Sequence, residues 1–89
     1  MRNAKTDKNQ REIVDGLRKM GFSVQVLSRV GQGFPDIMVG GFGRNFLFEV
    51  KSEHGRVNEK QIEWFSCWKG QAKVIRNLDE VIQEIQRGL

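Results

Sequence analysis

The chain is poor in the residues that build covalent or metal-linked scaffolds, since it has one cysteine, one histidine, one proline and no tyrosine. A lone cysteine cannot form an internal disulfide, and Cys67 has no Cys or His nearby at the spacing of a zinc site. We therefore expect Cys67 to be a small, packed apolar side chain. The apolar stretches are far shorter than the roughly 20 residues of a membrane span, and no signal-type apolar region follows the basic N-terminus. These absences predict a soluble, cytoplasmic protein without a membrane partner.

The composition is that of a small globular protein. The chain has 89 residues, of which 38% are hydrophobic and 29% charged, so we expect residues 1–89 to form one domain. The net charge is +4, and residues 1–30 carry seven Lys or Arg against three acids, which is the whole of the excess. Such a basic segment is typical of a phosphate-contacting surface, although a merely solvated helix face would have the same charge. The candidate DNA-binding residues are Arg2, Lys5, Lys8, Arg11 and Arg29.

The spacing of apolar residues predicts seven elements. Helical periodicity, with glycine or asparagine at the ends, indicates three helices, and alternation between glycines indicates four strands. The glycines at 40, 41 and 43 predict a tight hairpin turn. The predicted helices are 7–20, 58–69 and 78–89, and the predicted strands are 23–29, 37–39, 45–50 and 72–75. The order αβββαβα predicts an α/β (α+β) fold, with a mixed four-stranded sheet flanked by helices.

Three charged residues interrupt the most strand-like part of the chain. Asp36 begins the first strand of the predicted hairpin, and Glu49 and Lys51 end the second strand, two residues apart on one face. Because the turn lies at the far end of the hairpin, Asp36 and Glu49 can converge at its open end. Two close carboxylates repel unless they share a proton or bind a hard divalent cation such as Mg²⁺. Lys51 beside them favours an anionic substrate.

This arrangement predicts a metal site for phosphodiester cleavage. A cation held by Asp36, Glu49 and the Val50 backbone carbonyl would polarise a phosphate and acidify a water molecule. Lys51 would orient that water or stabilise charge in the transition state. On acid and lysine spacing alone, a solvated ion cluster at the end of a hairpin is the commoner structure.

The longer pattern favours the metal site. Gly33-x-Pro35-Asp36 is followed after twelve residues by Glu49-Val50-Lys51, which resembles the PD-(D/E)xK nuclease superfamily. With residues 9–14, Leu17-Arg18, Gly21 and Val74-Ile75, the chain resembles the virus-type replication-repair nuclease (VRR-NUC) domain as found in phages. The resemblance implies a restriction-endonuclease-like core and a DNA endonuclease dependent on Mg²⁺ or Mn²⁺. It also implies a homodimer similar to Holliday junction resolvases, in the host cytoplasm if the chain is phage-encoded.

The resemblance suggests further site residues. Gln61 matches a Gln or Glu of the family and shares a helix face with the aromatic residues 64, 65 and 68, so we expect it to point toward the sheet and serve the site. Alternatively it only completes the capping box of Asn58. Glu12 matches a first-helix acid that some relatives bring to the metal, although Gln10 lies nearer the apolar stripe and can take that place. We expect His54 to be exposed, with no catalytic task.

The substrate stays open at this point. The favoured hypothesis is a structure-selective endonuclease that resolves four-way junctions. The alternatives are a nickase, flap or restriction-type nuclease, or a DNA-binding module that does not cleave. Large apolar side chains around the hairpin and the helix at 58–69 exceed what one small core readily covers, so we expect some of them to line a dimer interface: Phe34, Phe42, Phe46, Trp64, Phe65 and Trp68.

Overall fold

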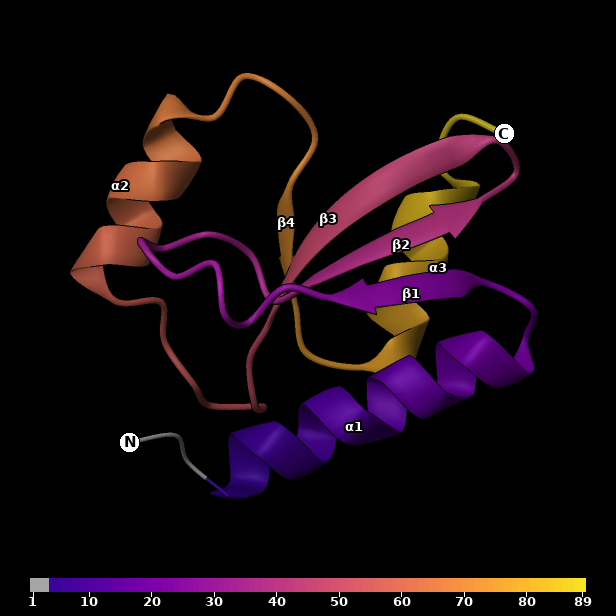
Figure 1. The fold of residues 1–89 in the computed structure, drawn as a ribbon, viewed down its shortest axis with the longest axis horizontal. Helices are drawn as coiled ribbons and strands as arrows, with labels where there is room; N and C mark the ends of the chain where they lie inside the picture. Colours follow the sequence, from indigo (N-terminus) through magenta and orange to yellow (C-terminus); the bar gives the residue numbers. More distant parts are fainter. Residues whose placement is uncertain (1–3) are drawn as a thin grey trace.

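The structure is a computed structural model that describes the backbone of residues 4–89 and the side chains from Lys8 onward. Seven elements follow one another in the predicted order αβββαβα (Figure 1). They are α1 (Ala4–Lys19), β1 (Ser23–Val26), β2 (Ile37–Gly41), β3 (Arg44–Val50), α2 (Glu59–Cys67), β4 (Lys73–Ile75) and α3 (Leu78–Gln86). Within these residues, no helix combines the length and the apolar character needed to cross a membrane.

The four strands form one mixed sheet in the order β1-β2-β3-β4. β1, β2 and β3 are a meander of antiparallel neighbours, and β4 pairs with β3 in parallel after the crossover through α2. The β2–β3 register places Ile37 opposite Phe48 and Gly41 opposite Arg44, with Phe42 and Gly43 in the turn at φ angles of 56° and 71°. The predicted mixed four-stranded sheet is confirmed.

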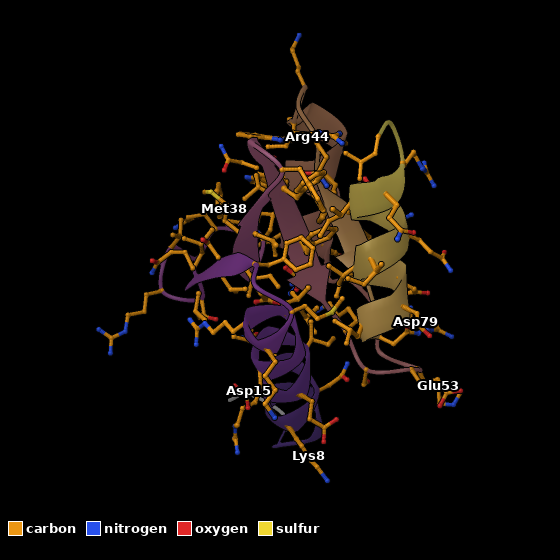
Figure 2. The ribbon with its side chains drawn as sticks, turned by 90° about the vertical axis from the view of Figure 1, so that its right-hand side faces the viewer. Lys8, Asp15, Met38, Arg44, Glu53 and Asp79 are labelled. Atoms are coloured by element: carbon orange, nitrogen blue, oxygen red, sulfur yellow. The ribbon has the colours of Figure 1, made fainter. Side chains whose placement is uncertain are left out.

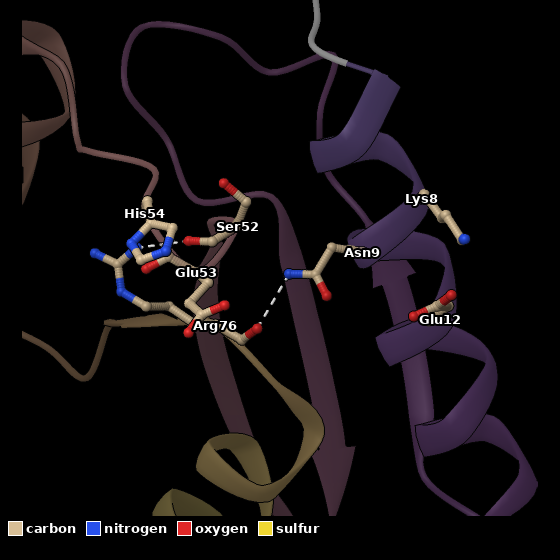
Figure 3. A pocket seen from close by; sticks show the side chains of 7 residues that line it. All are labelled: Lys8, Asn9, Glu12, Ser52, Glu53, His54 and Arg76. Carbon is tan, nitrogen blue, oxygen red and sulfur yellow. Dashed lines mark hydrogen bonds between the residues drawn. The ribbon is translucent and has the colours of Figure 1, made fainter.

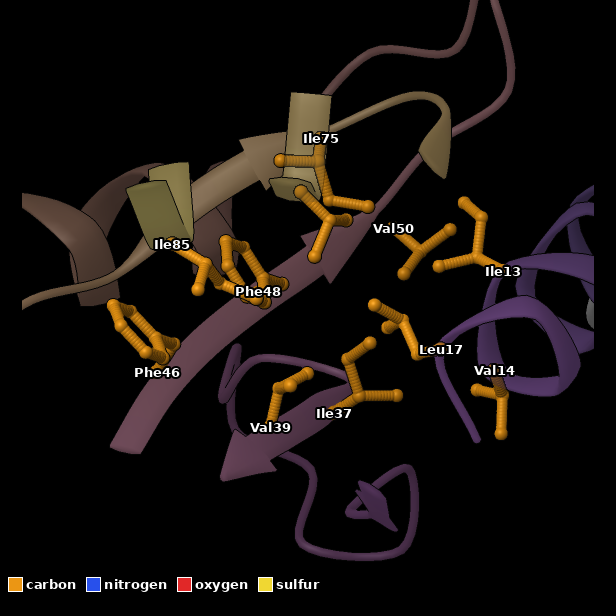
Figure 4. Packing of buried hydrophobic residues seen from close by; sticks show 11 residues of the cluster. Ile13, Val14, Leu17, Ile37, Val39, Phe46, Phe48, Val50, Ile75 and Ile85 are labelled. Atoms are coloured by element: carbon orange, nitrogen blue, oxygen red, sulfur yellow. The ribbon is translucent and has the colours of Figure 1, made fainter. Parts of the chain in front are cut away.

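The core lies on one face of the sheet, under α1 and α3 (Figure 4). Alternation along β3 sends Phe46, Phe48 and Val50 to that face, and it leaves Glu49 on the other. Figure 2 shows the apolar side chains between the sheet and the two helices, with Lys8, Asp15 and Asp79 directed outward. The remaining buried apolar residues are Ile13, Val14, Leu17, Ile37, Val39, Ile75, Val81 and Ile85.

The ends of two apolar stripes differ from the prediction. Ile13, Val14 and Leu17 are buried, but Met20, expected on the same stripe, is 55% exposed because α1 ends at Lys19 and Met20 enters the turn at Gly21 (φ 96°). Leu89, expected on the stripe of α3, is 66% exposed because that helix ends at Gln86. Helix ends depend on local backbone bonding, which apolar spacing does not report.

The second helix does not pack on the core. Figure 1 shows α2 standing to one side of the sheet, beside the loop that joins β1 to β2. None of the α2 residues is buried, so the expectation that Cys67 is packed was wrong, and Cys67 is exposed. The loop approaches α2 at Gly33 (φ 80°), where a Cβ atom would overlap the Lys60 carbonyl. Glycine is required there by both the conformation and the contact. That loop begins earlier than predicted, because β1 ends at Val26 instead of residue 29.

Candidate active site

The antiparallel pairing of β2 and β3 brings Asp36 to Glu49. Ile37 pairs with Phe48, so Asp36, directly before β2, lies beside the end of β3. Asp36 Oδ2 accepts a hydrogen bond from the Val50 N–H at 3.0 Å. Pro35 is buried and has no N–H to continue the ladder, which leaves this end of the hairpin open for side chains. In a strand the N–H and C=O of one residue point to the same side, so the Val50 carbonyl faces the same edge as Asp36.

Glu49 is the buried centre of the site. Its relative exposure is 2%, and its Oε2 accepts from Gln61 Nε2 at 2.8 Å and lies 3.4 Å from Lys51 Nζ. Its other oxygen, Oε1, is buried without a hydrogen-bond donor. A buried carboxylate oxygen without a donor is costly. The site therefore lacks one positive or proton-donating group on the side of Oε1.

The pKa of Glu49 reflects this environment. It is raised to about 8, first by burial, then by the negative charge of Asp36 and a hydrogen bond with that carboxyl, while Lys51 acts in the opposite direction. A proton shared between the two carboxyls would give Glu49 Oε1 the donor that it lacks when both are ionised. Without another cation, the pair holds a proton near neutral pH. A bound divalent cation would replace that proton.

The donor set fits a hard divalent cation. Two carboxylates and a backbone carbonyl are oxygen ligands, which Mg²⁺ and Mn²⁺ prefer, and the cation would supply the partner that Glu49 Oε1 lacks. Among the described residues no three His, Cys, Asp or Glu side chains cluster to hold a metal. The candidate ligands are therefore Asp36, Glu49 and the Val50 carbonyl, with water and phosphate oxygens for the remaining positions.

Gln61 both caps α2 and contacts Glu49. Its side-chain Oε1 accepts from the backbone N–H of Asn58 at 2.9 Å, and its backbone N–H donates to Asn58 Oδ1 at 2.9 Å. These two bonds complete the capping box of α2. The amide nitrogen of the same side chain donates to Glu49. One amide can do both because it carries an acceptor and two donors. The protein partner of this amide nitrogen is therefore Glu49.

Two residues that sequence reasoning missed hold the backbone around Lys51. Asn9 Nδ2 donates to the carbonyl oxygens of Lys51 (2.9 Å) and Arg76 (3.1 Å). Arg76 Nη1 donates to the carbonyls of Ser52 (2.7 Å) and Gly55 (2.6 Å), which fixes the loop after β3. The available signal was the position of Asn9, four residues before Ile13 on the apolar stripe of α1, where a polar side chain needs a partner.

The two α1 candidates, Glu12 and Gln10, lie in different surroundings. Glu12 is exposed and lines an open cavity of about 360 Å³ that includes neither Asp36 nor Glu49 (Figure 3). Gln10 is 8% exposed, and its Nε2 lies 3.5 Å from Ser28 Oγ. His54 lines the same cavity and is exposed, as expected. The remaining lining residues are Lys8, Asn9, Ser52, Glu53 and Arg76.

The candidate DNA-binding residues are on the surface where they are described. Lys8, Arg11 and Arg29 are exposed, the first two on α1 and the third in the loop between β1 and β2. Arg2 and the side chain of Lys5 lie outside the described residues. The exposure of these three side chains leaves their positive charges accessible to phosphate groups.

Comparison with solved structures identifies the fold. The chain is similar to a structure described as "VRR_NUC domain", with a TM-score of 0.74 and 22% sequence identity, over 98% of this chain and 100% of that one. No family model matches the sequence, and no curated protein matches it. At this identity the similarity establishes the architecture, which is that of a VRR-NUC domain with a restriction-endonuclease-like core.

Proposed function

We propose that this chain, which has the VRR-NUC fold, is a DNA endonuclease that depends on Mg²⁺ or Mn²⁺ and cleaves phosphodiester bonds in branched DNA, four-way junctions foremost. The observation that carries the proposal is the pair Asp36 and Glu49, with a buried carboxylate oxygen that lacks a partner and with Lys51 at 3.4 Å. Glu84 Oε1 is also buried without a hydrogen-bond donor, but Lys73 and Arg87 lie 3.7 Å and 3.8 Å from it. Among the described residues no ion pair involves Glu49 Oε1, and the second acid Asp36 lies beside this carboxylate, which supports a site that receives a cation.

Asp36, Glu49 and the Val50 carbonyl would hold the metal. When bound, the ion supplies Lewis-acid polarisation of the scissile phosphate and acidification of water. The Val50 N–H orients Asp36 through its bond to Oδ2, so the other carboxylate oxygen is directed to a ligand. Gln61 orients Glu49 in the same way through Oε2 and leaves Oε1 to the ion.

Lys51 acts on the substrate in this proposal. Its side chain is 16% exposed, so the ammonium group reaches the surface while it stays beside Glu49. From there it can donate hydrogen bonds to the phosphate oxygens as negative charge grows on them, or it can position the attacking water. Gln61 is proposed to assist cleavage by holding Glu49 in place. Its amide nitrogen carries a second N–H, which is proposed to serve the site as a further donor.

The DNA is proposed to lie across the basic surface of α1 and the loop between β1 and β2. Lys8, Arg11 and Arg29 would contact phosphates without reading sequence, which predicts binding that weakens steeply with salt. Two copies related by a twofold axis would present two such sites to the two symmetric strands of a junction. Phe42, 67% exposed at the hairpin turn, is one candidate for their contact.

A cleavage assay tests the proposal. Wild-type protein and the Glu49→Gln variant are incubated with Mg²⁺, Mn²⁺ or EDTA and with four-way, flapped, nicked and linear duplex DNA. We expect metal-dependent cutting of the branched substrates by wild type alone. Cutting confined to flaps or nicks would replace junction resolution with the flap or nickase alternative, and cutting of linear duplex would favour a restriction-type enzyme. Binding of DNA without cleavage of any substrate would refute the enzyme and leave a binding module.

A further inference from the structure

A second cavity lies between α2 and the loop that joins β1 to β2. It has a volume of about 380 Å³, within the lower range of small-molecule pockets. Four of its residues come from one face of α2, at positions 60, 63, 64 and 67, and Trp68 follows on the same side, while Gln32 lines it from the loop. Its walls therefore combine two indole rings with three polar side chains. We call these six residues the tryptophan pocket.

The indole rings of the tryptophan pocket are held in place before any ligand arrives. Trp64 and Trp68 are stacked, with centroids 4.7 Å apart and planes 19° from parallel. Phe34 contacts both of them edge-on, at 5.2 Å and 6.2 Å. The Trp68 indole N–H donates to the Gln71 carbonyl at 3.3 Å, which fixes the ring orientation, and yet Trp68 is 42% exposed. A rigid, exposed aromatic surface costs little ordering entropy when a flat partner stacks on it.

The tryptophan pocket is linked to the carboxylate site through residues close to it in the sequence, and its lining includes neither Asp36 nor Glu49. Gln61, which binds Glu49, is on the first turn of α2, and Phe34 is two residues before Asp36. With a helical rise of about 1.5 Å per residue, Trp64 and Trp68 lie about 4.5 Å and about 10 Å beyond Gln61 along the axis. Stacked nucleotides are spaced by about 3.4 Å. A DNA strand that runs along α2 from a phosphate at the carboxylates would carry its next few bases past the pocket.

From this geometry we infer that the tryptophan pocket binds an unpaired nucleobase of the DNA strand that is cleaved, by stacking on the exposed Trp68, whose other face is stacked on Trp64. The inference rests on the proposed nuclease function and adds a preference for DNA with unpaired bases beside the cut. A paired base cannot enter, because its faces are covered by neighbouring base pairs. Gln32 and Lys60 at the wall supply hydrogen-bond donors for the base edge or the adjoining phosphate.

A second copy of the chain is a less suitable occupant. The two most exposed apolar residues of this segment, Ile62 (54%) and Trp68 (42%), are separated by about 120° around the helix, so they do not form one flat patch. The cavity is concave and contains both Lys60 and Glu63, whereas the centre of a protein interface is depleted of charge. A single aromatic ring fits these features better than a helix or strand of a partner.

The test measures binding without cleavage, in EDTA. The probes are a fluorescent oligothymidine and an abasic oligonucleotide of the same length, which keeps the sugar-phosphate chain and lacks the bases. Base stacking contributes roughly 5- to 100-fold to affinity. We expect Trp68→Ala to weaken oligothymidine binding by this factor and to leave abasic binding unchanged. Trp68→Phe keeps an aromatic face and should retain most of the affinity. A loss that is equal for both probes, or no loss, overturns the inference.

Met20→Ala is the matched control. Met20 is a 55% exposed apolar residue directly after α1, and it belongs to neither the carboxylate site nor the tryptophan pocket. Its removal should leave the affinity for both probes unchanged. Thermal unfolding of each variant checks folding, and light scattering checks mass. A fall in mass in Trp68→Ala with unchanged oligothymidine affinity would overturn the inference and make the pocket a contact between copies.

The binding test and the cleavage assay fail separately. Loss of base-dependent binding in Trp68→Ala would stand even if the wild type cut nothing, because EDTA excludes cleavage. Conversely, metal-dependent cutting that needs Glu49, together with unchanged binding in Trp68→Ala, would keep the nuclease and overturn the base pocket. In an active enzyme the pocket predicts faster cutting of a flapped substrate than of the same substrate with abasic residues in the flap.

Discussion

Gln61 links the second helix to the buried acid, because its amide nitrogen donates to Glu49 Oε2 at 2.8 Å while its oxygen accepts from the Asn58 N–H. The cap that starts α2 and the contact that orients Glu49 are thus the same side chain. This arrangement ties the start of the helix to the geometry of the carboxylate pair. It also distinguishes the two oxygens of Glu49, because Oε2 is bound by protein groups and Oε1 is buried without a hydrogen-bond donor.

Removal of either carboxylate charge should abolish metal binding and cleavage. Asp36→Asn keeps an oxygen that can accept from the Val50 N–H, and Glu49→Gln keeps one for Gln61 and Lys51, so both variants should fold. Titration calorimetry with Mn²⁺ should show the loss, in parallel with the cleavage assay. Glu12→Gln is the comparison variant. Weakened metal binding there would add Glu12 to the ligands, and undiminished cleavage in Asp36→Asn would contradict the site.

Lys51→Ala should spare metal binding and slow cleavage. Loss of one donor to the transition state costs roughly 10²- to 10³-fold in rate. Single-turnover cleavage at saturating protein isolates this step from DNA affinity. Lys19→Ala removes an exposed lysine at the end of α1 and should have little effect on the rate. A change in DNA affinity alone would make Lys51 a phosphate anchor instead.

The metal-free protein should lose stability as the pH rises from about 5 to about 8. The pKa of Glu49 is raised from 4.5 to about 8 in the folded state, so the native protein holds a proton that the unfolded chain releases in this range. The proton's contribution to the free energy of unfolding is fully present below the pKa of the unfolded chain and is lost as the pH rises through the pKa of the folded protein. The loss is on the order of a few kcal/mol. Urea unfolding in EDTA at several pH values measures it.

The Glu49→Gln variant provides the control for this pH effect. Glutamine does not titrate, so the decline between pH 5 and pH 8 should largely disappear, and the variant should be more stable than wild type at pH 8. Mn²⁺ should likewise stabilise wild type most at high pH, where it replaces the lost proton. An equal pH dependence in both proteins would place the titrating group elsewhere.

Asn9→Ala should reduce stability and cleavage together. It removes the donor to the Lys51 and Arg76 carbonyls, and the loss of a buried partner costs about 1–3 kcal/mol. Because one of these carbonyls belongs to Lys51, the rate of cleavage should fall beyond what the unfolded fraction explains. Urea unfolding and the cleavage rate, compared with Asn77→Ala at the N-cap of α3, separate the two effects. An equal rate per folded molecule would make Asn9 purely structural.

The sequence predicted the sheet and the convergence of Asp36 and Glu49 because both depend on strand alternation and on the position of one turn. Residues 36 and 49 stand at fixed distances from Gly43, and a hairpin register follows from its turn. The contact of Gln61 with the site was expected from the helix face that it shares with Trp64, although its partner was not identified.

Other features could not be predicted because they depend on contacts between distant segments. Asn9 finds its two carbonyl partners only after α1 has packed over the ends of β3 and β4. Cys67 was expected to be packed because it has no disulfide or zinc partner, but α2 contacts a loop instead and leaves Cys67 exposed. Whether a helix reaches the sheet depends on the loops on both sides of it, and local periodicity carries no information on that distance.

Because none of its residues is buried, we expect α2 to open locally while the rest of the domain stays folded. The helix is held by Gly33, by the Phe34 contacts and by the bond from Gln61 to Glu49, whereas β3 is secured by the whole core. We expect the amide protons of Glu59–Cys67 to exchange with solvent much faster than those of Arg44–Val50, because local opening there requires little apolar surface to be exposed. Mass-spectrometric hydrogen exchange would measure the difference, and equal protection would contradict it. If the helix opens in this way, Glu49 loses its orienting amide at each opening, so the competence of the carboxylate pair fluctuates with the helix and not with the unfolding of the domain.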